Sequence, residues 1–488
     1  MKQALRSGGI MTFKDINFGD ASAETESARS PLLLTDGYLN INRIVEEALQ
    51  GYRFLFLGNK GSGKTALAEH IRLMSLNNPC LFSRLYVLRD FPYSRFLSLL
   101  GVEKGTEGRL PTAWSWILLI TLLDSFGDDA GSNVATDSDY YEALSSFRKI
   151  GILPAKDLRE LVLASAQKKV KASILSKVGI ELEYSPKGSD GDDLKFLHLV
   201  AHLKKLCFEF KSENQHIIIL DGLDNAILGD PIQYHSIATL IDEASALNGL
   251  LKRNSIQAKY IVLCRIDLFE KLPGANKNKT KQDYSVEIDW CSGQQPKDSP
   301  LIKLANRRAQ ISIEGLTDLF AEFFPPRIFN RNIHSVLLEY TRRTPRDFLQ
   351  LLKHIQLHSD SGILTYNQIR DGILDYSQKY FLTEIQDELY GIIERETVDI
   401  VFRSISSLRK NFFSIGELEK KLKQDEPRKD FALAEILRAF YEGGVIGNTF
   451  SSPDGSSKNR YKFTSPVAQF SVTDNIVIHR ALAKALFN

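Results

Sequence analysis

A glycine-rich octapeptide, Gly58 to Thr65, constrains the fold of this chain more than any other segment. Its order, Gly-Asn-Lys-Gly-Ser-Gly-Lys-Thr, matches G-x-x-x-x-G-K-[ST], the pattern of a P-loop. The apolar run 52–57 before it predicts a buried strand, and the sequence 66–73 after it predicts a helix. A strand, a glycine loop and a helix in this order predict the core of an α/β nucleotide-binding fold.

This loop predicts a binding site for a polyphosphate. Its glycines let backbone N–H groups curl around phosphate with no Cβ in the way, and the helix N-terminus adds partial positive charge. Lys64 is expected to reach the β- and γ-phosphates, and the Thr65 hydroxyl to bind Mg²⁺. A chance glycine turn is the alternative, which the strand and the helix disfavour. The predicted nucleotide-binding residues are Gly58, Asn59, Lys60, Gly61, Ser62, Gly63, Lys64, Thr65 and Ala66.

Two carboxylates follow the most apolar strand pattern in the chain, residues 216–220. Asp221 stands where a metal-binding carboxylate of a P-loop site belongs, so Thr65 and Asp221 are the predicted Mg²⁺ ligands. Asp224 is the candidate that orients and deprotonates the attacking water. The alternative is a strand-end turn, since Asp-Gly is a common turn pair.

Two arginines are further candidates to contact the γ-phosphate. Arg265 ends a predicted strand, 260–264, and Arg346 lies in the first turn of a helix that Pro345 starts, with Thr344 as N-cap. The predicted catalytic set is Lys64, Asp221, Asp224, Arg265 and Arg346.

Each arginine also has a structural alternative. Arg265 could pair with an acidic neighbour or lie on the surface, and Arg346 could form a salt bridge with Asp347 or with a neighbouring helix. Arg307 and Arg308 are weaker candidates for an arginine finger that acts on a neighbouring subunit.

The composition is that of a soluble globular protein: of 488 residues, 43% are hydrophobic and 25% are charged, and the net charge is +2. The length predicts two or three domains. The four cysteines lack metal-ligand spacing and are expected to be reduced. No apolar run is long enough to span a bilayer, and the best candidate, 114–123, is expected to be a core helix. A cytoplasmic protein without membrane contact is therefore predicted.

The pattern along the chain predicts an α/β fold: a P-loop core with a parallel sheet covered by helices, a large helical insertion, a helical lid and a winged-helix-like domain. The expected divisions are a flexible segment 1–30, a core 31–295 with its insertion at 92–211, a lid 296–383 and a C-terminal domain 384–488. Further strands are expected at 83–88, 179–184 and 284–288. Helices of the insertion are expected at 113–126, 139–150, 155–177 and 194–211.

The C-terminal domain is predicted from three helices followed by a hairpin. The helices are expected at 398–408, from Ser414 onward with Glu417 completing a capping box, and at 431–442. The hairpin pairs 445–450 with 461–463. Such a domain could bind DNA through basic residues or pack against a protein, and the sequence leaves both open. The candidate phosphate contacts are Lys429, Arg438, Lys458, Arg460 and Lys462.

The P-loop with Ile-Ile-Leu-Asp-Gly-Leu-Asp, Val-Leu-Cys-Arg and Thr-Pro-Arg-Asp resembles the additional-strand P-loop ATPases. That class includes the AAA+ proteins, the origin-recognition-like ATPases and the STAND signalling ATPases. More narrowly, the chain is similar to a bacterial P-loop ATPase family. The segments that suggest the narrower match are Phe18-Gly19, Asp283-Tyr284 and Ile478-His479-Arg480.

The resemblance implies ATP and Mg²⁺ as cofactors, a protein partner, a homo-oligomer, and a role in defence against phage or in mobile-element maintenance. The second acid comes as Gly-Leu-Asp where AAA+ proteins carry Asp-Glu, which favours a slow conformational switch over a fast motor. The alternatives are an origin-recognition-like ATPase that loads or remodels on DNA, and a scaffold that holds nucleotide without turnover. ATP is expected over GTP because no guanine-binding signature follows.

Overall fold

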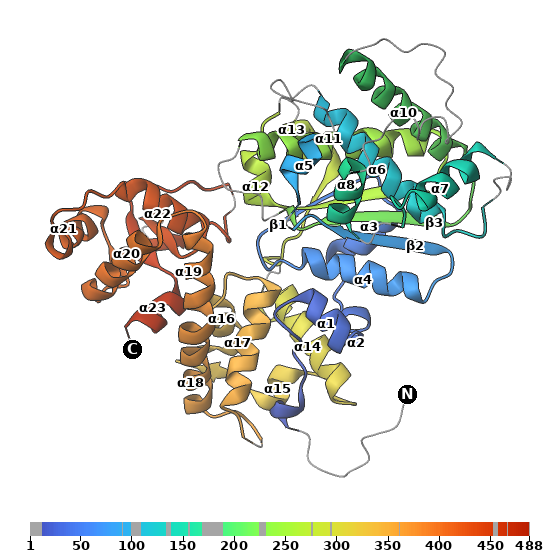
Figure 1. The fold of residues 1–488 in the computed structure, drawn as a ribbon. Coiled ribbons are helices and arrows are strands. Elements are labelled where there is room, and N and C mark those ends of the chain that lie inside the picture. The colour runs from blue at the N-terminus through green and yellow to red at the C-terminus, as the bar shows by residue number, and fades with distance from the viewer. Residues whose placement is uncertain are drawn as a thin grey trace. The chain divides into compact units, whose positions relative to one another are not determined.

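The chain forms two compact units in the computed structural model. One consists of Asn40–Ile288, and is called the P-loop unit below; the other consists of Met1–Leu39 with Asp289–Asn488, and is called the companion unit. Both are drawn in Figure 1. The structure describes residues 12–89, 91–98, 109–132, 138–154, 157–167, 189–223, 231–274, 277–292, 295–360, 362–451, 457–465 and 467–487.

A five-stranded parallel sheet forms the centre of the P-loop unit, in the order β2-β3-β4-β1-β5. Strand β4 lies between β1, which leads into the P-loop, and β3, which ends at Asp221. This is the additional strand that the resemblance implies. The α/β P-loop fold is therefore confirmed, and so are the strands expected at 83–88, 216–220, 260–264 and 284–288. The bounds are β1 Leu55–Gly58, β2 Leu81–Val87, β3 Gln215–Asp221, β4 Ala258–Arg265 and β5 Ser285–Glu287.

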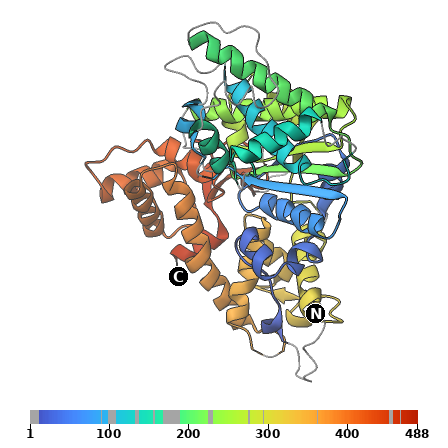
Figure 2. The same ribbon diagram turned by 45° about the vertical axis from the view of Figure 1, so that its right-hand side comes forward.

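Helices cover both faces of this sheet. The three central strands, β1, β3 and β4, require this cover because their residues are buried on both faces. Figure 1 shows α4 on one face and α6 and α11 on the other, and Figure 2 shows α4 (blue) running beside β2. The helices of the unit are α3 Ile44–Gln50, α4 Lys64–Leu76, α5 Tyr93–Ser98, α6 Leu110–Phe126, α7 Asp139–Lys149, α8 Leu158–Gln167, α10 Ser189–Glu209, α11 Pro231–Arg253, α12 Ile266–Lys271 and α13 Lys277–Tyr284.

Helix α6 is the apolar run that the sequence marks as a core helix, and this prediction is confirmed. Its side chains from Ala113 to Phe126 are all buried, which explains why the helix is apolar all round. None of the helices within the described ranges combines the length and the apolar character that a bilayer crossing needs. The strand expected at 179–184 lies outside the described residues.

A buried polar chain joins α6 to the start of β3. The Ser125 Oγ lies 2.9 Å from His216 Nδ1, and His216 Nε2 lies 3.2 Å from an oxygen of Asp129. The ring of His216 also stacks on Phe82. All three polar side chains are buried. Burial disfavours the charged ring and lowers the pKa of His216 to about 4, although the hydrogen bond that the ring donates to Asp129 opposes this shift.

The P-loop unit is therefore expected to lose stability between pH 6.5 and pH 4. An unfolded histidine has a pKa of about 6.5, so the unfolded state binds the proton first as the pH falls, and protons then favour unfolding. For His216 the loss is about 2 kcal/mol at pH 5. Urea unfolding at pH 7.5 and pH 5.0, localised by hydrogen exchange, measures it. Equal stability of the P-loop unit at both pH values would contradict the expectation, and His216→Gln should flatten the dependence.

The N-terminal segment corrects one prediction. Residues 12–30 are not the flexible segment expected for 1–30, because Phe13 and Phe18 are buried in the companion unit. Gln356 of that unit donates hydrogen bonds to the carbonyl groups of Phe13 and Ile16, at 2.7 and 2.8 Å. The polar residues that suggested flexibility lie mostly at the surface of this segment, and its two buried aromatic rings anchor it. Its elements are η1 Phe13–Asp15, α1 Ala23–Arg29 and α2 Leu32–Thr35.

The rest of the companion unit is mainly helical. A π-helix, η7 Ser377–Phe381, joins α18 to α19 without a break, so the boundary predicted between residues 383 and 384 falls inside α19. The division into a lid and a C-terminal domain stays a prediction. The elements up to this point are η6 Pro296–Asp298, α14 Pro300–Ser312, α15 Leu319–Phe323, β6 Arg327–Ile328, β7 Arg331–Asn332, α16 Ile333–Glu339, α17 Pro345–Leu357, α18 Tyr366–Tyr376 and α19 Leu382–Tyr390.

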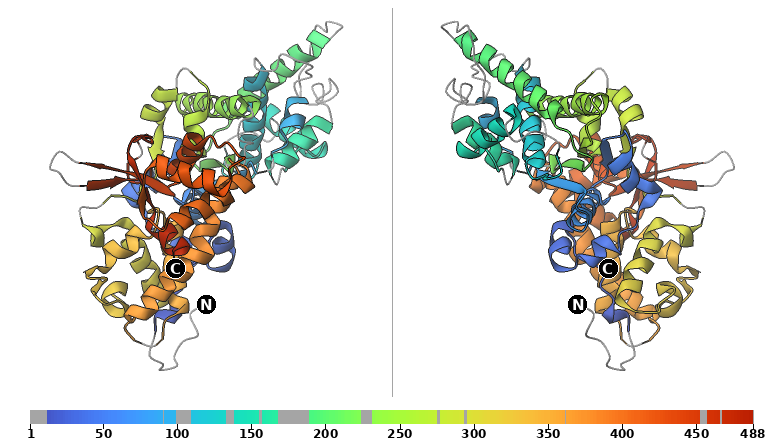
Figure 3. Two further views of the ribbon diagram at one scale, coloured as in Figure 1. Left: turned by 90° about the vertical axis from the view of Figure 1, so that its left-hand side faces the viewer. Right: turned by 90° about the vertical axis from the view of Figure 1, so that its right-hand side faces the viewer.

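The C-terminal region has the predicted winged-helix-like fold, with a larger sheet than expected. Three helices accompany a four-stranded sheet in the order β10-β9-β11-β8, in which β8 follows the first helix and the other three strands follow the third. Strands at the end of the chain are red in Figure 3. The capping box of Ser414 and Glu417 is present. The elements are α20 Arg395–Leu408, β8 Phe412–Phe413, α21 Ile415–Asp425, α22 Leu433–Glu442, β9 Ile446–Ser451, β10 Ser457–Arg460, β11 Asn475–Ile478 and α23 Arg480–Leu486.

The pairing expected for the hairpin was wrong. Strand β9 pairs with β10, which ends at Arg460, and not with 461–463. Tyr461 instead begins a turn, because its carbonyl accepts hydrogen bonds from the N–H groups of Thr464 and Ser465 at 3.1 and 3.0 Å. Strand β11, which the sequence analysis missed, then pairs with both β9 and β8.

Candidate functional site

The loop between β1 and α4 has the backbone shape that its glycines allow. Gly61 and Gly63 have φ values of +77° and +91°, a region that favours glycine. A Cβ on Gly58 would collide with the Ser62 hydroxyl. Helix α4 starts at Lys64, and its first N–H groups lack partners within the helix. The loop therefore presents backbone donors at a helix N-terminus, as an anion site requires.

Lys64 lies across this loop. Its Nζ donates hydrogen bonds to the carbonyl oxygens of Gly58 and Asn59, at 3.0 and 3.1 Å, and its side chain is only 6% exposed. Burying an ammonium group costs free energy unless the group has hydrogen-bond partners, and the two loop carbonyls are such partners. Phosphate oxygens are stronger partners for it, because they carry negative charge.

The two predicted metal ligands meet in space. The Thr65 Oγ1 donates a hydrogen bond to Asp221 Oδ2 over 2.7 Å, although the two residues are 156 positions apart in the sequence. The other carboxylate oxygen of Asp221 accepts from the Gly222 N–H at 2.7 Å. A hydroxyl and a carboxylate side by side are oxygen donors of the kind that Mg²⁺ prefers. The residues present therefore fit a P-loop Mg²⁺, while their role stays a prediction.

Gly222 turns the chain out of β3 directly after Asp221, and the sequence analysis gave it no role of its own. Its φ is +77°, and a Cβ there would lie 2.8 Å from Val87 Cγ1 on the neighbouring strand. The Asp-Gly pair was a sufficient signal for it. Asp224, the predicted base, lies outside the described residues, so its role remains a prediction.

Arg265 ends β4 at the same edge of the sheet as the P-loop. Its backbone is in register with Gly58 on β1, and β3 lies on the other side of β4. The guanidinium group forms two hydrogen bonds to Asp267, from Nε to Oδ1 at 2.9 Å and from Nη2 to Oδ2 at 2.7 Å. The structure thus shows the acidic neighbour that the sequence analysis offered as an alternative. That Arg265 also contacts phosphate stays a prediction.

Arg346 belongs to the companion unit. As predicted, Thr344 caps α17 by accepting from the Asp347 N–H, Pro345 starts the helix, and Leu349, Leu352 and Ile355 are buried. Arg346 itself pairs with Glu384 on the neighbouring α19 at 3.5 Å. It therefore shows the salt bridge to a neighbouring helix, and its contact with nucleotide stays a prediction.

Asp347 pairs with another arginine. Arg342 donates to Asp347 at 3.0 Å and to Glu388 on α19 at 2.8 Å, and Tyr380 donates to the same aspartate at 3.2 Å. Burial opposes ionisation of Asp347, but the charge and hydrogen bonds of Arg342 outweigh it and lower the pKa of the carboxyl group. This buried network fixes the start of α17 against α19.

Arg308 is not available as an arginine finger. It is buried and forms two hydrogen bonds to Glu26, at 2.6 and 2.8 Å, and one to the Phe18 carbonyl at 2.6 Å. Arg307 Nε donates to the Asp36 carbonyl. The weaker expectation for Arg308 was therefore wrong, because its charge is neutralised inside its own chain. Its partner Glu26 is 282 positions away, so no local pattern could show it.

The basic residues of the winged-helix-like region are mostly balanced by acids. Lys462 pairs with Glu442 at 3.3 Å, and Lys429 with Glu396 at 2.7 Å. Residues 384–488 contain 15 Asp and Glu residues and 15 Lys and Arg residues. Strand β10, which carries Lys458 and Arg460, is exposed along its length. This region thus has a local basic strand without an overall positive field.

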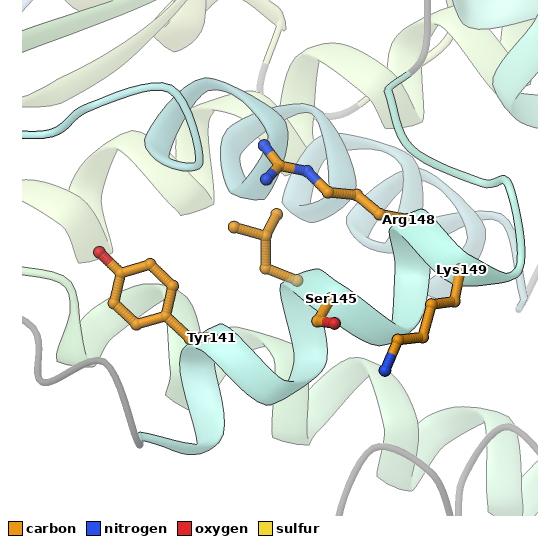
Figure 4. A pocket seen from close by; sticks show the side chains of 5 residues that line it. Tyr141, Ser145, Arg148 and Lys149 are labelled. Carbon is orange, nitrogen blue, oxygen red and sulfur yellow. The ribbon is translucent and has the colours of Figure 1, made fainter.

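Other candidate sites are weak. Within the described ranges, no group of three or more His, Cys, Asp or Glu side chains could hold a metal ion, and the four cysteines are present as thiols. A cavity of about 380 Å³ lies beside α7 and is lined by five residues, drawn in Figure 4. Its polar groups all come from one helix, and the figure shows Lys149 pointing away from Arg148. The lining residues are Tyr141, Leu144, Ser145, Arg148 and Lys149.

Comparisons with known proteins add little. A scan against protein-family models finds no match, and a search of curated proteins finds no relative. Among solved structures, the chain is similar to Cdc6p from Pyrobaculum aerophilum at 13% identity and a TM-score of 0.31, over 96% of this chain and 94% of that one. It is also similar to the Aeropyrum pernix Orc1 protein, solved in complex with DNA, at 11% identity and a TM-score of 0.39, over 94% of both chains. At these scores the likeness says nothing about function.

Proposed function

We propose that this chain is a Mg²⁺-dependent ATPase that works as a slow conformational switch. The observation that carries the proposal is the contact of Thr65 with Asp221 next to the buried ammonium group of Lys64. A strand-end carboxylate, a helix-start hydroxyl and a loop lysine brought together from distant positions are the parts that triphosphate binding needs. A glycine turn formed by chance would not require the Asp221 partner.

In this proposal the chain's own groups do the binding. The N–H groups of the loop and of the first turn of α4 donate to phosphate oxygens, and Lys64 exchanges two carbonyl partners for them. Thr65 and Asp221 would hold Mg²⁺, which would supply positive charge against the phosphates. Asp224 orients the attacking water and accepts its proton, and Arg265 responds to the γ-phosphate.

The partner is proposed to be a protein. The balanced charge of residues 384–488 gives no long-range attraction for nucleic acid, and many of their lysines are held in ion pairs. A homo-oligomer and a setting in defence against phage follow from the sequence resemblance alone. We keep them as part of the proposal.

A second candidate is a DNA-binding ATPase. The exposed strand β10 favours it, because Lys458 and Arg460 could reach phosphates from the wing of a winged-helix-like fold. Duplex binding that strengthens with ATP and weakens steeply with salt would select this candidate over a protein partner.

Replacing Asp221 tests the proposal through phosphate release. Asp221→Asn should lower Mg²⁺-dependent hydrolysis at least about 100-fold, because the amide is a poorer metal ligand and the lost stabilisation is several kcal/mol. Asp283→Asn is the matched control, since Asp283 is exposed on α13 of the same unit. Hydrolysis by Asp221→Asn at the rate of the parent would refute the metal assignment.

Two further results separate the remaining alternatives. A parent protein that binds ATP but releases no phosphate would be the scaffold without turnover. If Asp224→Asn hydrolyses ATP as the parent does, the proposed base is wrong.

A further inference from the structure

The hairpin of β6 and β7 carries a phenylalanine at a position where its turn favours other residues. Ile328 pairs with Arg331 across the hairpin. Phe329 and Asn330 therefore form its two-residue loop, and their φ values are +52° and +58°. A turn with positive φ at both positions is usually built from asparagine and glycine, and a bulky residue there is strained. Strain of this kind is often retained where a side chain has a function.

Phe329 packs against a second exposed aromatic ring. Its ring centroid lies 5.2 Å from that of Tyr366, the first residue of α18, and the two rings meet edge to face at 77°. The two residues are 37% and 49% exposed. Exposed aromatic side chains are frequent anchors of protein interfaces. The two rings thus form a corner that can receive an apolar side chain.

Arginines flank this aromatic pair. Arg327 Nη2 donates a hydrogen bond to the Asn330 carbonyl at 3.3 Å, which places its charge at the tip of the hairpin, next to Phe329. Arg370 follows Tyr366 by four residues on α18, so the two side chains share one face of the helix. Both arginines are exposed.

A shared carboxylate holds two more arginines nearby. Glu339 accepts two hydrogen bonds from Arg331, one of them at 2.7 Å, and forms an ion pair with Arg480 at 2.9 Å. Burial raises the pKa of Tyr340, and the same three charged groups and the Tyr366 hydroxyl also act on that pKa. Tyr340 therefore lies near both the charged group and the aromatic pair.

The four arginines of this region are matched by two carboxylates. Arg370 pairs with Asp371 at 2.9 Å, while Glu339 serves two arginines. Among the residues that the structure describes, no carboxylate lies within ion-pair distance of Arg327. An excess of positive charge attracts an acidic ligand and disfavours a basic one.

The ring geometry and the ion pairs favour an acidic protein segment over a nucleic acid. Single strands bind to aromatic side chains that offer separate faces to successive bases, whereas here the edge of one ring meets the face of the other. Three of the four arginines already pair with carboxylates, which weakens their attraction for a row of phosphates. One carboxylate next to one apolar side chain suits the corner and Arg327, because a guanidinium group can bind a carboxylate at two points.

We propose that Phe329, Tyr366 and Arg327, called the hairpin surface below, bind an acidic segment of the partner protein. An aromatic or branched apolar side chain of that segment packs between the two rings, and a neighbouring carboxylate pairs with Arg327. The other arginines add long-range attraction. This inference deepens the proposed function, and it rests on that function only in taking the partner to be a protein.

A displayed library of random peptides of about 12 residues tests the proposal on the full chain, without nucleotide. Peptides that bind the parent but not Phe329→Asn should carry more acidic than basic residues, next to an aromatic or branched apolar residue. Fluorescence anisotropy with one of these peptides should show binding at least about 5-fold weaker for Phe329→Asn and for Tyr366→Ala, the size expected for an interface anchor. Arg327→Ala should weaken binding about 2- to 5-fold.

Phe412→Ala and Arg428→Ala are the matched controls. Both side chains are exposed in the companion unit and neither belongs to the hairpin surface, so these variants should bind the peptide as the parent does. The urea midpoint of Phe329→Asn should equal or exceed that of the parent, because asparagine tolerates positive φ better than phenylalanine does.

Equal peptide binding by the parent and Phe329→Asn would overturn the proposal, and so would a selection that yields no such acidic peptide. If Phe329→Asn lowers the urea midpoint, the other two variants decide, and unchanged binding in both overturns it. Oligothymidine that binds the parent and loses affinity in the same variants would assign the surface to nucleic acid instead. Loss of peptide binding leaves the ATPase proposal intact, and a parent that does not hydrolyse ATP leaves the hairpin surface intact.

Discussion

Replacing Lys64 with alanine is expected to lower ATP hydrolysis about 100- to 1,000-fold, the effect of removing one preorganised donor from a developing charge. ATP affinity should fall about 10- to 100-fold, because a charge-assisted hydrogen bond contributes about 1.5–3 kcal/mol. Phosphate release and titration with a fluorescent ATP analogue measure the two effects. The physical reason is that the Lys64 ammonium group already lies over the loop, where it donates hydrogen bonds to the carbonyls of Gly58 and Asn59.

Lys252→Ala is the matched control for this experiment. Lys252 is exposed on α11 of the same unit, outside the loop. This variant should keep most of the activity. Equal activity of Lys64→Ala and the parent would mean that the loop does not bind the triphosphate.

The second large effect is expected from the buried pair of Glu26 and Arg308. Arg308→Met should lower the free energy of unfolding of the companion unit by about 3–5 kcal/mol, because it leaves the Glu26 carboxylate buried without its partner. Hydrogen exchange of residues 12–35 should rise with it, since the pair ties this segment to α14. The double variant Glu26→Met/Arg308→Met should recover most of the lost stability, because it leaves no unpaired buried charge.

Gly19 gives an independent test of the same pair. Its φ is +89°, and a Cβ there would collide with Glu26 Oε2 and Arg308 Nη1. Gly315 has a similar φ of +83°, but a Cβ on it would meet nothing within 4 Å. Gly315→Ala should lower the free energy of unfolding by about 1–2 kcal/mol, because the backbone at this position is unfavourable for alanine. Gly19→Ala should lower it clearly more. Equal losses of stability in the two variants would show that Glu26 and Arg308 can move aside for the added methyl group.

The sequence was sufficient for those parts of the fold whose signals are local. The P-loop strand, the strand before Asp221 and the strand before Arg265 are short apolar runs that end in glycine or polar residues, and all lie where they were expected. The capping residues Thr344 and Ser414 were likewise visible, because an N-cap acts within three residues of itself.

The errors concern contacts between distant positions. The segment 12–30 was expected to be flexible because it is polar, but it is held by Arg308 and Gln356, which lie far along the chain. Strand β11 was missed because its extended structure depends on pairing with β8 and β9, which its own sequence does not reveal. The segments Phe18-Gly19 and Ile478-His479-Arg480, which suggested a narrower family, also have structural roles: Gly19 makes room for the pair, and His479 caps α23.

The residues of the candidate site were predicted more fully than the acidic residues that pair with its arginines. Thr65 and Asp221 were expected to share a metal, and the structure brings them into contact. The partners of the two arginines, Asp267 and Glu384, were not identified. Asp267 is only two residues from Arg265 and could have been found from the sequence, whereas Glu384 is 38 positions from Arg346 and depends on how α17 packs on α19.

A crystal structure with Mg²⁺ and a non-hydrolysable ATP analogue tests the account most directly. The triphosphate should lie over residues 58–65, with Lys64 turned from the loop carbonyls to its oxygens. The metal ion should lie between the Thr65 hydroxyl and the Asp221 carboxylate, which no longer contact each other. A nucleotide bound elsewhere, with the 2.7 Å hydrogen bond between Thr65 and Asp221 intact, would contradict it.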